Sequence, residues 1–190
     1  MGKLVVTEFV TLDGVIEDPG GGEKETFDRG GWAFRFERGE EGDRFKFDEL
    51  MASDAQLLGR VTYEGFARAW PAMEGAGAFG ERMNEMPKFV VSTTLEHPEW
   101  NNTTVLRGDL TAEVGALKER FSGDILVAGS ATLVQSLLAR DLVDELRLMV
   151  FPVVLGKGKR LFAAAADMTS LSLVETRHSG SVAILTLEKG

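Results

Sequence analysis

With 190 residues, of which 44% are hydrophobic and 27% charged, the chain resembles a single ordinary globular domain spanning residues 1–190. Its formal net charge of −9 argues against a broad nucleic-acid surface, and no apolar run approaches the ~20 residues that a membrane span needs. The absence of cysteine excludes disulfides, thiolate metal sites and cysteine nucleophiles, and it agrees with a cytoplasmic location. His97 and His178 are the only histidines, so we expect no metal site.

Short apolar runs alternate with amphipathic segments along the chain. We expect strands at 3–11, 55–59, 88–93, 103–108, 124–129 and 143–156. We expect helices at 43–54, 61–70, 111–121 and 130–142, and a weakly helical crossing at 72–87. Thr111 is a candidate N-cap for its helix, and Pro152 indicates an edge, a bulge or a break in the last of these strands.

The C-terminal segment 171–190 contains two alternating runs around the letters HSGS, which predicts a β-hairpin. Strands that alternate with helices and then end in a hairpin are typical of an α/β protein. We therefore predict a mixed, mainly parallel sheet flanked by helices, with antiparallel C-terminal strands. These last strands can pair across a two-fold axis, so we expect a homodimer through them.

The connection from Asp13 to Asp43 is long and rich in Gly and Asp. A connection of this length inside a compact domain is usually functional or mobile. It contains Trp32, Phe34 and Phe36, which a merely solvated loop does not need. Two interpretations of Trp32 stay open, as a wall of a substrate pocket or as a core tryptophan.

The stretch LLGRVTYE joins a buried strand to a helix, and ligands of open α/β sheets bind at such carboxyl ends of strands. Gly59 permits a tight turn, Arg60 offers a fork of donors that matches a phosphate, and Thr62 can cap the helix or bind the same anion. Taken alone, the pattern favours a capped helix with a surface arginine.

Two further junctions have a similar character. In DILVAGSATLVQSLL a strand runs into small residues at 129–132, which let a diphosphate reach the free N–H groups of the first helical turn. A capped turn without a ligand has the same pattern, and no Walker A lysine is present. In FVVSTTLE, Ser92 and Thr93 follow a strand and either bind a ribose or phosphate or begin a loop.

Together, these junctions resemble a known superfamily. LLGRVTYE resembles the Gly-Arg-x-Thr-aromatic-Glu signature of dihydrofolate reductases, FVVST resembles the strand and serine that follow it, and ILVAGSATLVQSLL resembles their diphosphate turn. VTEFVTLDGVIE resembles the loop that closes over nicotinamide. TLDG and DELRLMVFPVVLGKGKRLF are closer still to the reductase domain of the bifunctional riboflavin-biosynthesis deaminase-reductase. The resemblance covers nearly the whole chain, which lacks the cysteines of that enzyme's zinc deaminase.

The resemblance implies a dihydrofolate-reductase-like fold and an NADPH-dependent reductase that acts on a small molecule. Arg60 would neutralise the 2′-phosphate, and Thr62 would lie in the diphosphate site. Further cofactor contacts would be Thr11, Gly14, Val15, Gly59, Ser92, Thr93, Gly129, Ser130, Ala131 and Thr132. Ser130 replaces a glycine of the family, so either the cofactor lies less close or the hydroxyl binds phosphate. Trp32, Phe47 and Leu155 would line the substrate pocket.

Hydride transfer to a C=N or C=O group needs a proton donor or a relay to water. The resemblance, counted back without gaps from the Gly-Arg junction, points to Asp43, which a helix N-cap would also explain. Its neighbours Asp48 and Glu49 are more typical of a solvated helix face. Asp13 is the stronger candidate, because the resemblance puts it beside the nicotinamide, although Asp-Gly is also a common turn.

Lys157 and Lys159 either meet a substrate phosphate or lie on an exposed turn, and the turn is the favoured interpretation. Three hypotheses for the function follow. The ordered junctions favour an NADPH-dependent reductase, and the absence of a convincing proton donor favours a nucleotide-binding module without redox turnover. A structural protein that pairs through its C-terminal strands is the third.

Overall fold

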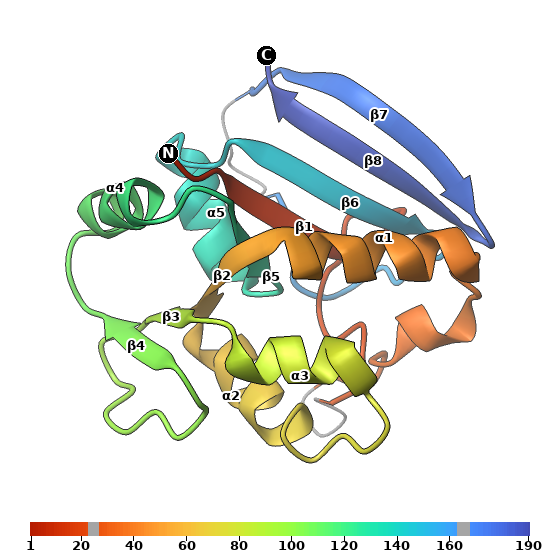
Figure 1. Cartoon of the computed structure of the whole chain (residues 1–190). Helices are drawn as coiled ribbons and strands as arrows, with labels where there is room; N and C mark the ends of the chain where they lie inside the picture. The colour runs from red at the N-terminus through yellow and green to blue at the C-terminus, as the bar shows by residue number, and fades with distance from the viewer. Residues whose placement is uncertain (23–26, 163–167) are drawn as a thin grey trace.

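The computed structural model describes residues 1–22, 27–162 and 168–190, which form one eight-stranded sheet with helices on both faces (Figure 1). The strands are β1 (Leu4–Thr11), β2 (Ser53–Gly59), β3 (Lys88–Val91), β4 (Thr103–Leu106), β5 (Asp124–Ala128), β6 (Glu145–Phe151), β7 (Leu171–Ser179) and β8 (Val182–Lys189). The helices are α1 (Gly39–Ala52), α2 (Arg60–Ala69), α3 (Gly77–Glu85), α4 (Leu110–Arg120) and α5 (Ala131–Ala139), with a 3₁₀ helix at Trp32–Arg35.

The strand order is β4-β3-β2-β5-β1-β6-β8-β7. Strands β1 to β6 run parallel to one another, and β8 runs antiparallel to both of its neighbours, β6 and β7. The predicted mixed sheet with antiparallel C-terminal strands is therefore confirmed. Strand β1 lies between β5 and β6, and its residues are almost all buried because helices cover both faces of a parallel sheet.

Alternate residues of β1 pack into two different apolar cores, because successive side chains of a strand point to opposite faces of the sheet. Leu4, Val6 and Val10 belong to the apolar cluster that α4 and α5 close. Val5 belongs to a cluster with residues of α1, α2 and α3 on the opposite face. Helix α1 crosses the front of the sheet in Figure 1, and the β7–β8 hairpin forms its far edge.

Parallel strands end at the same edge of a sheet, so the junctions that follow β1, β2, β3 and β5 lie along one edge. Strand β5 follows β4 in the chain but inserts between β2 and β1 in the sheet. The chain therefore changes direction across the sheet at this point, which is where open α/β sheets place a ligand crevice.

Three local expectations need correction. The 111–121 helix is capped by Asp109, whose carboxylate accepts from Ala112 N, and not by Thr111. The strand expected at 143–156 ends at Phe151, because Pro152 breaks it. Helix α1 begins at residue 39, so Asp43 lies inside the helix and is not its N-cap. Across the described ranges, no helix has the length and apolar character needed to cross a bilayer.

Candidate functional site

The junctions after β2 and β5 are hydrogen-bonded to each other. Gly59 N donates to Ser130 Oγ at 2.8 Å, and Ser130 N donates to Thr62 Oγ1 at 2.9 Å. Thr62 makes no side-chain cap to its own helix, because its hydroxyl accepts from the neighbouring junction instead. The two glycine-containing turns thus form one rigid unit at the edge of the sheet.

The turn that precedes α5 has a backbone conformation and a close contact with Thr62 that favour glycine. Gly129 has a φ of +59°, and a Cβ there would lie 3.0 Å from Thr62 Oγ1, so a side chain would be strained on both counts. Ser130, at the N-cap, also has a left-handed conformation with a φ of 60°. The amides of the next three residues form the open first turn of α5, at the positive end of its dipole.

Arg60 is the first residue of α2, and its side chain is 44% exposed. Its guanidinium pairs with Glu64 on the next helical turn, with Nη1 at 2.9 and 3.0 Å from the two carboxylate oxygens. An exposed pair of this type contributes only ~0.3–0.5 kcal/mol, so a phosphate can displace Glu64 at little cost. Arg60 therefore is available to an anion that approaches this edge of the sheet.

The junction after β3 uses its first hydroxyl locally. Ser92 Oγ accepts from Thr94 N at 3.2 Å and from Leu95 N at 3.0 Å, which stabilises the loop that begins there. Thr93 is exposed. Arg107, at the end of β4, donates to Ser92 O and Leu95 O and holds this loop against the edge of the sheet.

The loop after β1 is fastened to the segment after β6. Asp13 Oδ1 accepts from Leu155 N at 3.1 Å, and Asp13 Oδ2 accepts from Gly156 N at 2.8 Å. Thr11 Oγ1 donates to Asp13 Oδ1 at 2.6 Å and accepts from Val15 N at 2.9 Å. The TLDG and PVVLG motifs, far apart in the sequence, therefore form one hydrogen-bonded unit in which Asp13 is the anchor.

This environment argues against Asp13 as a proton donor. Partial burial alone would raise its pKa, but the hydrogen bonds from Thr11 and from the backbone amides of Leu155 and Gly156 outweigh burial and lower the pKa to about 2. The carboxylate is therefore ionised near neutral pH and carries no proton to give. The Asp-Gly sequence therefore forms a turn whose carboxylate is bound by backbone amides that follow β6.

Gly14 and Val15 continue the same unit. Leu161 N donates to Gly14 O at 2.9 Å, and Val15 bridges to Arg160. Gly158 has a φ of +121°, and a Cβ there would come within 2.7 Å of Val15 Cγ1, so only glycine permits this approach.

The lysines of this segment lie on the surface. Lys157 pairs with Asp28 at 2.7 Å, and Lys159 lies 3.5 Å from Glu17. Both are exposed, as the interpretation of this segment as a surface turn expected.

Of the acidic residues of α1, Asp48 lies on a solvated face as expected, whereas Asp43 and Glu49 differ from their predictions. The Asp43 side chain is 62% exposed and pairs with Arg38 at 2.7 Å, so Asp43 does not fit the buried acid that was expected. Asp48 is exposed as well. Glu49, expected on a solvated face, is buried against the sheet, where its Oε2 atom accepts from Thr7 Oγ1 at 2.9 Å and from Lys46 Nζ at 2.5 Å.

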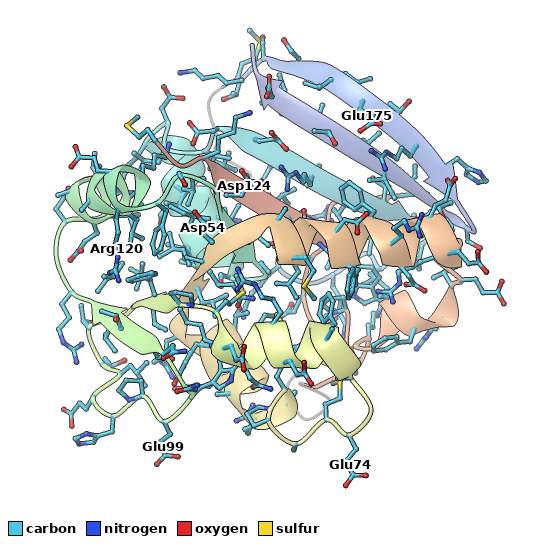
Figure 2. The ribbon with its side chains drawn as sticks, viewed as in Figure 1. Asp54, Glu74, Glu99, Arg120, Asp124 and Glu175 are labelled. Atoms are coloured by element: carbon cyan, nitrogen blue, oxygen red, sulfur yellow. The ribbon has the colours of Figure 1, made fainter. Side chains whose placement is uncertain are left out.

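Arg147, on β6, completes a charged layer beneath α1. Its guanidinium lies 3.6 Å from Glu49, 2.7 Å from Asp124 and 2.5 Å from Glu145. Asp124, labelled in Figure 2, begins β5, so this layer runs from the middle of the sheet toward the amino ends of the strands. It therefore lies away from the edge that carries the paired junctions.

Sequence reasoning missed Glu8, a carboxyl group buried in the middle of the sheet. Glu8 is 4% exposed, and its Oε1 atom has no hydrogen-bond partner among the described residues. Burial raises its pKa well above the usual range, although a backbone hydrogen bond from Gly129 and the charge of Lys46 act in the opposite direction. The signal was present in the sequence, because an acidic residue at a buried position of a central strand is unusual.

Of the three residues expected around a substrate, Trp32 and Leu155 lie together in the buried core and Phe47 lies on the surface. Trp32 is 0% exposed, donates from Nε1 to Glu17 O at 2.9 Å and contacts Phe151 edge-on, so it is a core tryptophan. Leu155 is buried in the same apolar cluster. Phe47 is 40% exposed on α1, away from that cluster.

Two hollows of the described surface lie away from these junctions. One is lined by residues of α1 and β7, including Asp48 and His178, and the other lies beside Trp100 and Asn84. Within these same ranges, no three His, Cys, Asp or Glu side chains converge as ligands for a metal ion. The arrangement at the paired junctions is thus an open edge of backbone amides, hydroxyls and one arginine, which suits a phosphorylated ligand.

Comparison with known proteins gives a family. Residues 2–185 match the family described as RibD C-terminal domain. The uncharacterized protein YyaP of Bacillus subtilis (strain 168) is 30% identical over 188 residues, which cover 96% of this chain and 93% of YyaP. The uncharacterized protein YwjB of the same organism is 29% identical over 178 residues, with coverage of 94% and 92%.

Solved structures share the fold at lower identity. A putative riboflavin biosynthesis protein from Shewanella sp. PV-4 superposes with a TM-score of 0.77 at 20% identity and covers 99% of both chains. RibD of Acinetobacter baumannii gives 0.69 at 16% identity, and the match covers all of this chain and 58% of RibD. Dihydrofolate reductase from Enterococcus faecalis, complexed with NADP(H) and RAB-propyl, gives 0.57 at 14% identity, with coverage of 99% and 96%. The predicted dihydrofolate-reductase-like fold is confirmed.

Proposed function

The chain belongs to the RibD C-terminal domain family, and from this premise we propose that it is an NADPH-dependent reductase of a small C=N or C=O compound. The observation that carries the proposal is the hydrogen-bonded pair of junctions, in which Thr62 and Ser130 hold Gly59 and Gly129 beneath the open first turn of α5. Backbone amides at a helix N-terminus bind phosphate groups, and Gly129 has no Cβ to obstruct them.

The chain's residues fit a dinucleotide in the following way. Residues 129–132 would hold the diphosphate, and Arg60 would leave Glu64 to pair with the 2′-phosphate. Ser92 and Thr93 would border the adenosine, and the anchored loop of Thr11, Gly14 and Val15 would border the nicotinamide. Bound NADPH would supply the hydride, and the protein would orient the two reactants and exclude water. The substrate is a dihydrofolate-like or ribosylamino-pyrimidine-like heterocycle, or another carbonyl or imine.

The test is a comparison of NADPH with NADH, because only NADPH offers Arg60 a 2′-phosphate. NADPH at 100 times its dissociation constant is expected to add roughly 2.7 kcal/mol to the free energy of unfolding, measured as a rise in melting temperature. Arg60→Ala is expected to lower the affinity for NADPH about tenfold or more and to leave the affinity for NADH almost unchanged. Arg68→Ala, an exposed arginine at the other end of α2, is the matched control. If neither nucleotide raises the melting temperature, the proposal is contradicted.

One observation favours a second candidate, a nucleotide-binding module without redox turnover. Of the two carboxylates expected to donate a proton, Asp13 is ionised and Asp43 is exposed. This candidate predicts a thermal shift with NADPH and no NADPH oxidation across a panel of pterins, pyrimidines, aldehydes and imines. Oxidation of NADPH by any member of that panel, at a rate above the protein-free control, would remove it.

We also propose that the chain forms a homodimer through its last strands. Strand β7 is an edge strand of the described sheet, opposite β4, and Leu173 and Val174 are 58% and 56% exposed on it. An open edge with apolar side chains readily pairs with a second strand. Analytical ultracentrifugation is expected to show a dimer that Val174→Lys dissociates, and a monomer at all concentrations contradicts it.

A further inference from the structure

Strand β7 leaves a long edge of the sheet open to a partner. It has nine residues, pairs with β8 alone, and every residue from Ser172 to His178 is exposed. In Figure 1 it forms the outer rim of the sheet, and no described segment lies beyond it. The other edge strand, β4, has only four residues. Lysine and proline commonly protect an edge from pairing, and β7 contains neither, so this edge suits a second strand.

The β7–β8 hairpin determines which backbone groups of β7 are free. Its turn has two residues, and Ser179 pairs with Val182 at its base. A two-residue turn is closed by a hydrogen-bonded pair, and such pairs alternate with non-hydrogen-bonded pairs along an antiparallel ladder. The ladder is regular from Ser179 back to Glu175. The backbone groups of Thr176 and His178 therefore point away from β8 and toward the open edge.

Two opposite charges flank Thr176 on this strand. Glu175 and Arg177 are two positions apart, so both side chains project from the same face of the sheet. There Arg177 donates to the two carboxylate oxygens of Glu175 at 2.9 and 3.0 Å. The guanidinium carbon of Arg177 also lies 5.5 Å from the centre of the Phe45 ring, so this is the face that α1 covers. Both charged side chains are 46% exposed, and Glu175 is labelled on the outer strand in Figure 2, so a partner can reach them.

These charges distinguish between the registers in which β7 can pair with a second copy of itself. Identical antiparallel strands pair about a two-fold axis, and their outward backbone groups meet when that axis passes through a residue. An axis through Thr176 places Glu175 of each copy opposite Arg177 of the other. An axis through Glu175 or Arg177 places two like charges opposite each other, which is unfavourable. A larger slip places neither residue opposite its counter-charge, so β7 is self-complementary in one register only.

We propose that two copies of the chain pair antiparallel along β7 about a two-fold axis through Thr176, and that their sheets join into one continuous sheet. The inference rests on the homodimer proposed above and specifies its register. Glu175 and Arg177 of both copies then form one network of four charges across the seam. The exposed apolar side chains of Leu173 and Val174 lie beside the end of the second β7, which covers part of their surface.

The first experiment reads the register by cross-linking. The chain contains no cysteine, so a single cysteine variant can form a disulfide only with its counterpart in a second copy. Thr176→Cys places the two Cα atoms about 5.5 Å apart in a hydrogen-bonded pair, which is within the range of a disulfide. Under mild oxidation this variant is expected to give a covalent dimer on a non-reducing gel.

His178→Cys is the matched control for the cross-link. Its two copies lie about 14 Å apart along the seam, because each is two positions from the axis and on opposite sides of it. This variant is expected to stay monomeric on the same gel. Equal cross-linking of both variants, or no cross-link with Thr176→Cys, overturns the proposal.

The second experiment exchanges the charges. Glu175→Arg places arginines opposite each other and is expected to raise the dissociation constant of the dimer about tenfold or more in analytical ultracentrifugation. Glu175→Gln breaks the pair within the strand without adding a like charge, so it is expected to have a smaller effect. Adding Arg177→Glu to Glu175→Arg restores opposite charges across the seam and is expected to restore the dimer.

The outcomes separate the register from the homodimer itself. A dimer that withstands Glu175→Arg, or a double variant that does not recover, overturns the register and leaves a homodimer through another contact. If the unmodified protein is a monomer at all concentrations, the homodimer proposal fails and the register fails with it.

Discussion

The backbone amide of Ser130 donates to the hydroxyl of Thr62 at 2.9 Å, although 68 positions separate the two residues in the chain. This bond joins the turn before α5 to the first turn of α2. Thr62→Val keeps the shape of the side chain but removes the acceptor, which leaves the amide of Ser130 without this partner. The variant is expected to lose about 1–2 kcal/mol of unfolding free energy in urea titrations. Its NADPH affinity is also expected to fall, while the exposed Thr111→Val is expected to change neither quantity.

The lowered pKa of Asp13 predicts that the free energy of unfolding depends on pH in the acid range. Its pKa in the folded protein is about 2, below the ordinary value of 3.8, so its contribution to stability is present above pH 4 and is lost as pH falls through 2. Asp13→Asn replaces one acceptor by an amide donor that faces a backbone N–H. The variant is expected to unfold about 2 kcal/mol more easily at pH 7, and its stability is expected to depend less on pH between 4 and 2. Urea titrations at each pH measure the stability and its pH dependence. An unchanged pH dependence would contradict the role of Asp13 as an anchor.

The raised pKa of Glu8 predicts the opposite, a free energy of unfolding that falls as pH rises. Its pKa is raised in the folded state, so folded protein binds more protons than unfolded protein above the ordinary range of a glutamate. The free energy of unfolding is therefore expected to fall as pH rises from about 5 toward the raised pKa. Glu8→Gln is neutral at every pH, so it is expected to remove this part of the slope. Urea midpoints of both proteins between pH 5 and 9 give the comparison, and parallel curves contradict it.

Lys88 is a buried lysine whose charge is held by backbone oxygens. Its Nζ atom donates to Asn84 O and Met86 O at 2.8 Å and to Asn101 O at 2.9 Å, and it lies 4.4 Å from the centre of the Trp100 ring. Burial nevertheless lowers the pKa of Lys88 to about 8. The group joins the end of α3 to the loop between β3 and β4.

Lys88→Met is expected to destabilise the fold at pH 7 by about 2 kcal/mol, because three carbonyl groups lose their donor. In the unmodified protein the folded state releases its proton first, so the free energy of unfolding is expected to rise between pH 8 and 10.5. That rise is expected to be absent from the variant. Lys157→Met, on the surface, serves as the control for loss of a lysine. Equal stability of both variants would contradict the structural role.

The sheet and its edge were readable from the sequence because the signals are local. Alternation within 3–11 and small residues after 124–128 are sufficient to predict buried strands and an anion-sized turn. The antiparallel hairpin followed from two alternating runs around Gly180 and Ser181. Local patterns did not contain the hydrogen bonds between the junctions. Thr62 was interpreted as a cap for its own helix or an anion ligand, and its bond to the turn before α5 was not predicted.

The charged residues inside the fold were the least predictable part. A charge on a helix usually indicates a solvated face, but Glu49 is buried where Thr7, on a strand far away in the sequence, and Lys46 both donate to it. Counting back from Gly59 gave Asp43, but α1 runs directly into β2 and turns that side chain outward. Asp13 was predicted as the proton donor, with an Asp-Gly turn as the alternative, and the amides that bind its carboxylate follow β6 and are not visible locally.

The central position of β1 has a consequence for biosynthesis. This strand leaves the ribosome before its two neighbours in the sheet, β5 and β6, which begin at Asp124 and Glu145. While the residues between are synthesised, an apolar strand with two unpaired edges is exposed, and such strands attract chaperones and other nascent chains. The paired junctions cannot form before Ser130 has emerged, and the Asp13 anchor cannot form before Gly156 has, so the site is completed only after β6 has been made.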